Sequence, residues 1–436
     1  MNSRESLAIV GTGIAGMGAA HLLKDHFDIT LFEKNNYVGG HTNTVFVDED
    51  EKIIPIDTGF MVFNKVTYPN LIDLFNDLKV PIKETDMSFS VQHRPTGLEY
   101  NGSGFSGLFA QKRNYLNPKF LKMLLDINQF NSQSIKDLES GDFDQCSLKD
   151  YIAAKGYGKN FVEKYIVPMS SAIWSTPSKV TLNFPFVTIV RFMKNHGMLG
   201  LNTQHQWYTV VNGSETYKNR IIAPFKDRIH TSKGVVGVIR QSQNVELITR
   251  DGQIHHFDKV IIAAHGDEAL NMLTNPTNDE RQLLSKFRYQ PNIATLHTDH
   301  SIMPKNKKIW SAWNYNIIEQ GGITKPSTIY YMNSLQHVSK NNDYFVSIND
   351  QGLISPRKVI KEIAYTHPIF NLEAIQAQSK LSSLNKSGPV YFCGSYFKYG
   401  FHEDAYASAV NLSKDILKNL SEPSNKDERD SALMPV

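Results

Sequence analysis

The chain has 436 residues, 41% of them hydrophobic and 20% charged, which is the composition of a soluble globular protein and a length that predicts two domains. Its formal net charge is only +3, so nothing points to a nucleic-acid partner, and we expect none. The two cysteines, Cys146 and Cys393, are too few for a disulfide framework or a metal cluster. No apolar run reaches the roughly 18 residues that span a bilayer. The apolar run near the N-terminus is too short for a signal peptide.

The chain opens with a strand–turn–helix–strand pattern. The apolar run at 7–10 predicts a buried parallel strand, which passes through the glycine-rich stretch 11–16 into a helix of small residues at 17–24. A second apolar strand at 28–32 ends in Glu33. Strand, glycine turn, helix, strand and acid in this order are typical of a dinucleotide-binding domain.

The residues of this pattern have distinct expected roles. Gly11 permits the tight turn, Gly13 lets the backbone approach a pyrophosphate, and Gly16 lets helix and strand pack closely. The pyrophosphate is expected at the helix N-terminus, where free N–H groups and the helix dipole favour an anion. Glu33 is expected to accept hydrogen bonds from the ribose hydroxyls of adenosine.

The continuation past Glu33 differs from that of a nicotinamide dehydrogenase. A glycine pair, Gly39–Gly40, is followed by a predicted hairpin at 44–55 and then by Asp57-Thr58-Gly59. These stretches resemble the superfamily of flavin-containing amine oxidases and phytoene desaturases, in which a Gly-Gly pair follows the acid and lies near the cofactor. His41 stands where that superfamily usually has arginine, and it is either a phosphate or flavin contact or a surface-loop residue.

The region from about 70 to 200 shows no parallel-strand alternation and predicts a mainly helical substrate domain inserted into the cofactor domain. Within it, 105–138 is predicted to be a basic amphipathic region. Such a region either lies on a membrane surface or packs on its own domain with a solvated basic edge. Its predicted apolar stripe consists of Phe120, Leu124, Ile127, Phe130 and Ile135.

Strand patterns return after residue 205. Strands at 235–241 and 245–249 predict a small three-stranded insert, and the apolar run at 259–264 predicts a strand that rejoins the parallel sheet. Between 292 and 350 the patterns predict a mostly antiparallel sheet in the substrate domain. Its aromatic residues either line an apolar pocket or belong to the core. They are Trp310, Trp313, Tyr315, Tyr330 and Tyr331.

A last predicted strand ends at Gly394-Ser395, and a loop leads to a helix that begins near Glu403. This stretch resembles the second flavin motif of the same superfamily, in which the strand-end glycine approaches the pyrophosphate and the helix N-terminus points at the pyrimidine edge of the flavin. A positive helix end stabilises the negative charge of reduced flavin. Many relatives have an acid after the glycine, whereas this chain has Ser395, so the resemblance gives no carboxylate–ribityl contact here.

Together these features predict an α/β fold: a Rossmann-like FAD-binding domain, glutathione-reductase-like and of the amine-oxidase type, with an interleaved α+β substrate domain. The expected ranges are 1–70, 205–285 and 380–420 for the FAD-binding domain, 71–204 and 286–379 for the substrate domain, and 421–436 for a disordered tail. The resemblance implies noncovalent FAD. The residues expected to hold it are Gly11, Gly13, Ile14, Ala15, Gly16, Glu33, Lys34, Gly39, Gly40, His41, Thr42, Thr58, Gly59, Phe60, Val236, Ala264, Gly394, Ser395, His402, Glu403 and Asp404.

Nearly the whole chain also resembles one bacterial branch of this superfamily, the predicted NAD/FAD-binding amine oxidoreductases, through the stretches 87–91, 172–177 and 394–404. Members of that branch tend to be associated with cyclopropane-type fatty-acid methyltransferases. The resemblance implies hydride transfer from a substrate C–H to flavin N5, with desaturation of a methylated or unsaturated fatty acyl or other lipid chain. An amine oxidase that forms imine and hydrogen peroxide, a non-catalytic flavin-binding protein and an isomerase remain alternatives.

Flavin chemistry asks little of the protein beyond position, electrostatics and a modest base. His402 and Glu403 are the candidate catalytic residues by location, and Tyr208 is a further candidate. Capping of the helix and complementing its dipole are the alternative roles of His402 and Glu403, and these are favoured over catalysis. No metal is expected. The expected partner is an apolar small molecule or lipid, and the expected location is the cytoplasm, or the inner membrane face if region 105–138 meets it.

Overall fold

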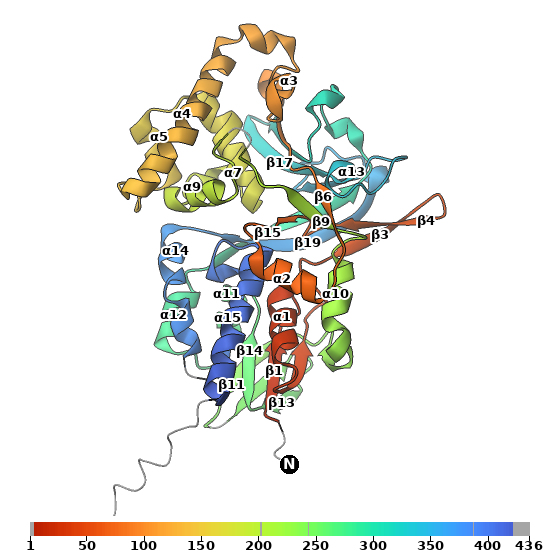
Figure 1. The fold of residues 1–436 in the computed structure, drawn as a ribbon, viewed down its shortest axis with the longest axis vertical. Coiled ribbons are helices and arrows are strands. Elements are labelled where there is room, and N and C mark those ends of the chain that lie inside the picture. Colours follow the sequence, from red (N-terminus) through yellow and green to blue (C-terminus); the bar gives the residue numbers. More distant parts are fainter. Residues whose placement is uncertain (1–3, 201–202, 243, 387, 422–436) are drawn as a thin grey trace, which may run out of the picture.

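The computed structural model describes residues 4–200, 203–242, 244–386 and 388–421, so all of the expected tail at 421–436 except Ser421 lies outside the described residues. The chain forms two lobes stacked along the long axis of the molecule (Figure 1). We call them the parallel-sheet lobe, which contains the N-terminal strand, and the mixed-sheet lobe.

The parallel-sheet lobe is built on five parallel strands in the order β10-β2-β1-β14-β20. Alternate side chains of β1 face opposite layers, as a strand requires. Leu7 and Ile9 pack in one core with the helices α1 and α15, whereas Ala8 and Val10 pack in another core with the small antiparallel sheet β11-β12-β13. The elements of this lobe are β1 (Ser6–Val10), α1 (Ile14–Leu23), β2 (Asp28–Phe32), α10 (Glu215–Ile222), β10 (Ile229–His230), β11 (Val235–Arg240), β12 (Val245–Thr249), β13 (Ile254–Phe257), β14 (Lys259–Ile262), α11 (Gly266–Met272), α12 (Asn278–Leu284), β20 (Val390–Phe392) and α15 (His402–Ser421).

The mixed-sheet lobe contains a seven-stranded sheet in the order β19-β15-β18-β17-β16-β7-β8. All neighbouring pairs are antiparallel except β16 and β7, which run parallel. Its strands are β7 (Phe89–His93), β8 (Leu98–Asn101), β15 (Arg288–His297), β16 (Trp313–Gln320), β17 (Ile323–Tyr331), β18 (Phe345–Ile348) and β19 (Val359–Ile369). The sequence patterns missed β19, because charged residues and a histidine interrupt its apolar alternation.

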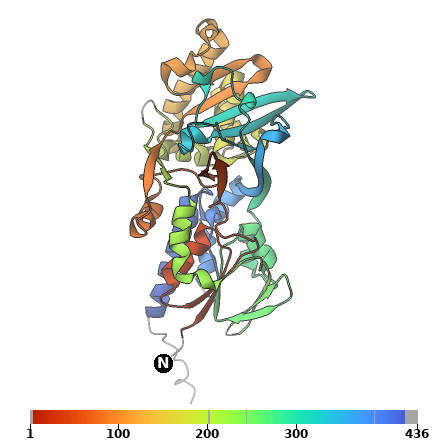
Figure 2. The ribbon, with the colours of Figure 1, turned by 90° about the vertical axis from the view of Figure 1, so that its right-hand side faces the viewer.

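Helices cover one side of this sheet, at the end of the molecule farthest from the chain termini (Figures 1 and 2). One of these helices begins after Ser147, which forms a capping box with Asp150. The helical elements are α3 (Gly104–Leu108), the 3₁₀ turn η2 (Lys112–Leu116), α4 (Pro118–Ser140), α5 (Leu148–Lys155), α6 (Lys159–Phe161), the π-helical turn η3 (Val162–Ile166), α7 (Val167–Trp174), α8 (Ser178–Thr181), α9 (Phe186–Asn195) and α13 (Met332–Leu335).

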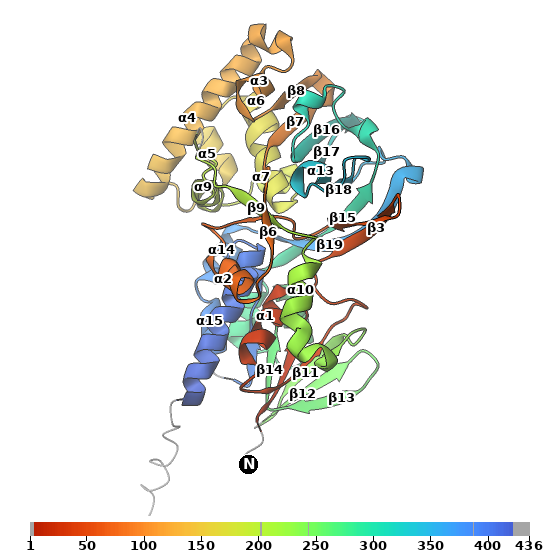
Figure 3. The ribbon, with the colours of Figure 1, turned by 45° about the vertical axis from the view of Figure 1, so that its right-hand side comes forward.

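The chain crosses between the lobes several times, and small sheets mark the crossing (Figure 3). The hairpin predicted at 44–55 forms from β3 (Thr44–Glu49) and β4 (Lys52–Asp57). The strand near 207 does not enter the parallel sheet; as β9 (Trp207–Val210) it pairs with β5 (Phe63–Asn64) and β6 (Ile82–Thr85).

Two helices pack with a different lobe from the one that the expected domain ranges give them. α2 (Pro69–Asp77) buries Leu71, Leu74 and Phe75 in the core of the parallel-sheet lobe. α14 (Leu372–Gln378) lies beside α12 in the same lobe (Figure 1). The expected domain ranges were drawn where the strand pattern changes. Such a change does not show against which lobe the apolar face of a neighbouring helix packs.

Candidate functional site

The glycine turn between β1 and α1 has the predicted shape. Gly11 has a φ of +99°, and a Cβ there would lie 2.6 Å from the Ala263 carbonyl oxygen. A Cβ on Gly16 would lie 1.9 Å from the Gly11 carbonyl oxygen, so helix and turn meet backbone to backbone. At Gly13, by contrast, no atom lies within 4 Å of the position of a Cβ. The space in front of Gly13, at the N-terminus of α1, is therefore open.

The loop with the glycine pair faces this open space. Gly40 has a φ of +59°, and its Cβ would lie 3.3 Å from the Cα of Gly13. Gly59, from the stretch after β4, packs on the same loop, because its Cβ would lie 2.2 Å from the carbonyl oxygen of His41. Two separate stretches thus bring backbone, without side chains, close to the N-terminus of α1.

Glu33 is buried at the end of β2. Its Oε2 accepts hydrogen bonds from the amide and the hydroxyl of Thr12, at 3.0 and 2.6 Å, and its Oε1 accepts one from the amide of Asn35 at 2.9 Å. A carboxylate has about four acceptor positions. One therefore remains on Oε1, which is what a ribose hydroxyl requires.

Two other expected cofactor residues lie near this edge. Lys34 forms an ion pair with Glu268 of α11. Val236 on β11 is 49% exposed, which leaves its side chain open to a ligand.

His41 lies inside the molecule at the contact of the two lobes. Its ring stacks on Tyr365 of β19 with centroids 4.7 Å apart, and the ring of His367 meets it at 5.3 Å. Its Nε2 is buried and has no hydrogen-bond partner among the described residues. A buried donor or acceptor without a partner is costly, so this atom is suited to a polar ligand atom.

Buried imidazoles at this contact are held neutral. Burial, followed by repulsion from His367, His265 and His402, lowers the pKa of His41 well below its ordinary value. Burial likewise lowers the pKa of His367 to about 4 and that of His402 to about 3. Within the described part of the chain, no group of three or more His, Cys, Asp or Glu side chains is placed to hold a metal ion.

The start of α15 meets the N-terminal loop. The helix begins at His402, whose ring stacks on Phe60 with centroids 3.8 Å apart. The Nε2 of His402 lies 2.5 Å from the hydroxyl of Tyr217, and that hydroxyl also bonds to Thr42. One cluster of side chains thus contains Thr42, Phe60, Tyr217 and His402. All of them except Tyr217 were named from the sequence. We call this group the His402 cluster.

The strand-end glycine of the second motif lies beside the first motif. A Cβ on Gly394 would lie 3.3 Å from the carbonyl oxygen of Ala264 and 2.7 Å from the ring of Tyr396. The amide of Gly394 donates to the Ser408 hydroxyl of α15 at 2.9 Å. Ser395 follows as the first residue of a 3₁₀ turn.

Glu403 points away from the His402 cluster, to the N-terminus of α2. Its carboxylate accepts hydrogen bonds from the amide of Asn70 at 3.1 Å, the side chain of Asn70 at 2.7 Å and the amide of Leu71 at 2.9 Å. An anion at a helix N-terminus satisfies free N–H groups and complements the dipole. Glu403 thus caps α2, a different helix from its own, and the sequence did not predict this partner.

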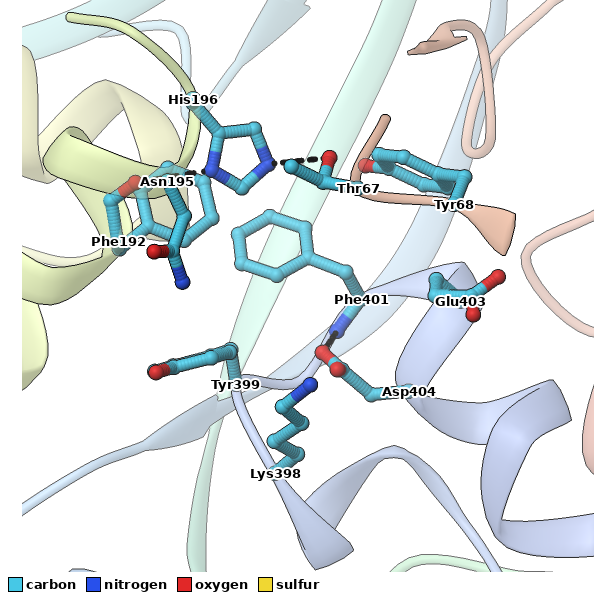
Figure 4. Close-up of a pocket in the computed structure, with 10 residues that line it drawn as sticks. All are labelled: Thr67, Tyr68, Phe192, Asn195, His196, Lys398, Tyr399, Phe401, Glu403 and Asp404. Atoms are coloured by element: carbon cyan, nitrogen blue, oxygen red, sulfur yellow. Dashed lines mark hydrogen bonds between the residues drawn. The ribbon is translucent and has the colours of Figure 1, made fainter. Parts of the chain in front are cut away.

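A cavity of about 50 Å³ lies beside the start of α15, between the lobes (Figure 4). Its walls include Asp404, Lys398, Tyr68 and His196, whose Nε2 bonds to Thr67 at 3.1 Å. The Asp404 carboxylate accepts the Phe401 amide at 3.0 Å, and burial raises its pKa to about 7.

Asp57 joins the lobes through a network that sequence reasoning missed. Its carboxylate accepts the amide and the hydroxyl of Ser214 at the start of α10, the hydroxyl of Thr44 and the side-chain amide of Gln336. The Gln336 side chain accepts the Asp57 amide in return, at 2.9 Å. The Gly213-Ser214 pair is the one local signal of the network, because glycine followed by serine before a helical pattern indicates a helix start.

Thr58 and Tyr208 lie on the border of the site. Thr58 bonds to the hydroxyl of Tyr365 at 3.0 Å, which ties the stretch after β4 to β19. Tyr208 packs on Phe63, with ring centroids 6.2 Å apart, and Lys65 lies over its ring. No contact among the described residues joins Tyr208 to the His402 cluster.

These features fit FAD. The open helix N-terminus suits the pyrophosphate, Glu33 suits the ribose, and the unpartnered Nε2 of His41 suits a phosphate or flavin oxygen. Glycine turn, glycine pair and the start of α15 would hold the cofactor across the lobe contact.

Comparisons with known proteins agree with this reading. The profile of the family described as flavin containing amine oxidoreductase matches residues 14–335. The chain therefore belongs to the flavin-containing amine oxidoreductase family, whose members are flavin enzymes, and the predicted fold class is confirmed.

Two curated relatives match parts of the chain. The 1-hydroxycarotenoid 3,4-desaturase of Flavobacterium sp. (strain P99-3) is 25% identical over 222 residues, 48% of this chain and 40% of that protein. The uncharacterized protein R656 of Acanthamoeba polyphaga mimivirus is 39% identical over 71 residues, 16% of this chain and 14% of that protein. The chain thus aligns with less than half the length of either relative.

Solved structures are similar over almost the whole chain. Putrescine oxidase bound to putrescine superposes with a TM-score of 0.68 at 13% identity, covering 95% of this chain and 99% of that one. The CLA-producing fatty acid isomerase from P. acnes gives 0.65 at 12% identity, covering 97% and 99%. At this level of identity the likeness shows the fold.

Proposed function

We propose that the chain is an FAD-dependent oxidoreductase that desaturates a fatty acyl or other lipid chain, with a methylated acyl chain as the leading substrate. Bound FAD supplies the acceptor for the hydride that leaves a substrate C–H. The second hydrogen of a desaturation leaves as a proton. The protein's part is to hold the cofactor noncovalently, orient the chain and exclude water.

The proposal of a neutral substrate rests on one observation, the pairing and ionisation of the carboxylates around the start of α15. Asp57 is buried in its network with Ser214 and Gln336, and Glu403 is bonded to the N-terminus of α2. Asp404 shares its cavity with Lys398, and burial raises its pKa to about 7. Asp57 and Glu403 thus have their charges taken up by hydrogen-bond donors, and Asp404 is only partly ionised at neutral pH. A substrate ammonium group would need a full and free negative charge, whereas an acyl chain needs none.

The titratable groups of the His402 cluster also support an uncharged substrate. Burial lowers the pKa of His402 to about 3 and raises the pKa of Tyr217, so the hydrogen-bonded pair is uncharged at neutral pH. An imidazole with so low a pKa is a weak base. We propose that His402 and Tyr217 orient the start of α15 and its neighbour Phe60 rather than store a proton.

The relatives support a lipid more than an amine. The sequence relative of known name is a carotenoid desaturase, and one structural relative is a fatty acid isomerase. The likeness to putrescine oxidase rests on fold at 13% identity. The chain also resembles the bacterial group associated with cyclopropane-type fatty-acid modification. This resemblance is the reason for proposing a methylated acyl chain as the substrate.

The test is anaerobic reduction of the flavin-loaded protein. Methylated and unsaturated phospholipids are offered in one arm, straight saturated phospholipids in a second, and putrescine and cyclohexylamine in a third, while the visible absorbance of the flavin is followed. We expect bleaching with the methylated or unsaturated lipid, and a product that has lost two hydrogens by mass spectrometry. Bleaching by amines alone would refute the proposal in favour of an amine oxidase. A product of unchanged mass, formed while the flavin ends in its oxidised state, would indicate an isomerase.

A further inference from the structure

The exposed apolar residues of the basic region are not those of the predicted stripe. Phe120 and Phe130 are buried, and the rest of the stripe packs against the core of the mixed-sheet lobe. The helix α4 thus packs on its own domain, as one of the two sequence expectations held. A second set of large apolar side chains nevertheless faces outward: Phe105, Tyr115, Leu116, Leu121 and Leu125, exposed by 66%, 46%, 89%, 39% and 70%.

These five residues lie on consecutive elements of the chain, and we call them the ridge. The rings of Phe105 and Tyr115 lie 5.9 Å apart, and Phe109 stacks against Tyr115 at 4.3 Å. Leu116 follows directly, and Leu121 and Leu125 are spaced four residues apart on one face of α4. The elements α3 and α4, which carry Phe105, Leu121 and Leu125, lie at the end of the mixed-sheet lobe farthest from β1 (Figures 1 and 3). Monomeric proteins seldom expose such a contiguous apolar surface without a use.

A basic cavity opens beside the ridge. It has a volume of about 620 Å³, and its walls include the first residues of α4 and the turns α6 and η3. Its charged lining consists of Arg113, Lys119, Lys159, Lys164 and one acid, Glu163. Cavity and ridge share the segment from η2 into α4, since Arg113 lies two residues before Tyr115 and Lys119 two residues before Leu121.

Lys164 shows that this charge is only partly balanced within the protein. It is only 9% exposed, and among the described residues no carboxylate lies within 4 Å of its Nζ. Glu163 is the one acid of the lining and already pairs with Lys159 at 3.7 Å, whereas Lys119 and Lys159 add positive potential beside Lys164. A cavity of this kind is complementary to an anion that the protein itself does not supply.

We propose that the ridge and the basic cavity together dock the protein on an anionic phospholipid surface, with the ridge in the acyl boundary and a headgroup phosphate in the cavity. Protruding aromatic and leucine side chains beside lysine and arginine are the combination that interfacial binding requires. A soluble anion satisfies the cavity but leaves the ridge in water, whereas an anionic bilayer satisfies both. The docking does not depend on the proposed function, because it concerns a surface apart from the flavin cradle.

The test is vesicle co-sedimentation of the full flavin-loaded chain. Vesicles of phosphatidylcholine alone are compared with vesicles that also contain phosphatidylglycerol. We expect binding to the anionic vesicles, weakened by added salt. The double variant K119Q/K159Q should bind about 25-fold more weakly, at about fivefold per charge near the surface. The variant L116S/L125S should bind at least about tenfold more weakly, because both leucines leave water on docking.

Matched controls lie in the parallel-sheet lobe. Lys414 on α15 and Ile254 on β13 are exposed, and K414Q and I254S should bind as the wild type does. Equal binding to both kinds of vesicle, or unchanged binding of both double variants, would overturn the proposal. So would a dimer in solution that L116S/L125S dissociates, since a second copy would then cover the ridge. The readout is vesicle partition, so a failure here is distinguishable from a failure to desaturate lipids.

Discussion

Replacing Gly13 by valine should abolish flavin retention while leaving the folded chain almost as stable as before. Gly13 has φ −63° and ψ 176°, an extended conformation open to any residue, and no atom lies within 4 Å of its Cβ position. In the protein alone the Cβ of the new side chain therefore has open space around it. The same space is where the pyrophosphate is expected, at the N-terminus of α1.

The magnitudes follow from these two facts. Valine reduces the freedom of the unfolded chain by about 0.4–1 kcal/mol, which offsets a loss of similar size at the helix N-cap. The free energy of unfolding of the flavin-free protein should thus change by less than about 1 kcal/mol. Displacing the pyrophosphate from one or two N–H groups costs about 1.5–3 kcal/mol each, which weakens FAD binding by about tenfold to 10⁴-fold.

G16A is the matched control, because its Cβ would lie 1.9 Å from the Gly11 carbonyl oxygen. Such overpacking costs about 1–3 kcal/mol or more and should lower the thermal midpoint of the flavin-free protein. The assay compares the flavin-to-protein absorbance ratio after purification with thermal unfolding of flavin-stripped protein by circular dichroism. Wild-type flavin content in the Gly13→Val variant, or a midpoint as low as that of G16A, would refute the assigned turn.

Three further predictions concern the buried titratable groups. Glu403→Gln removes a charge that accepts N–H groups of α2 and should lower the free energy of unfolding of flavin-stripped protein by about 1–2 kcal/mol, measured by denaturant titration. Asp57→Ala leaves the Ser214 amide unpaired in the interior and should cost about 2–4 kcal/mol by the same assay; a value near zero would contradict the network. Burial lowers the pKa of His402 to about 3 and that of His367 to about 4, below the value of about 6.5 in an unfolded chain. Their stabilisation is therefore complete above about pH 6.5 and is lost as the pH falls toward 4, so the thermal midpoint should fall over that interval, and His367→Gln should flatten the fall.

The parts of the fold that depend on local sequence were predictable. β1, the glycine turn and β2 lie at the predicted positions to within a residue, because apolar runs and obligatory glycines act over a few residues. The second motif gave the start of α15 to within one residue for the same reason.

The contacts that complete the site were not predictable, because they join distant stretches. Tyr217 reaches His402 across 185 residues of sequence, and no pattern around either residue records the partner. β19 carries Tyr365 and His367 to His41, yet its mixed composition hides the strand. The exposed ridge was missed for a different reason: periodicity identified the face of α4 that packs inward, and Leu121 and Leu125 lie off that face.

The contact between the two lobes contains several acids and histidines, yet their charges are either paired or absent. Asp57 and Glu403 each meet the start of a helix, α10 and α2, so N–H groups balance their charges. The imidazoles of His41, His367 and His402 are neutral because burial disfavours their charged forms. With these groups neutral or paired, the N-terminus of α15 keeps its positive potential for a flavin. Under the proposed function, the shape and apolarity of the walls then select the substrate, and a counter-charge does not, which is a condition that suits an acyl chain better than a charged amine.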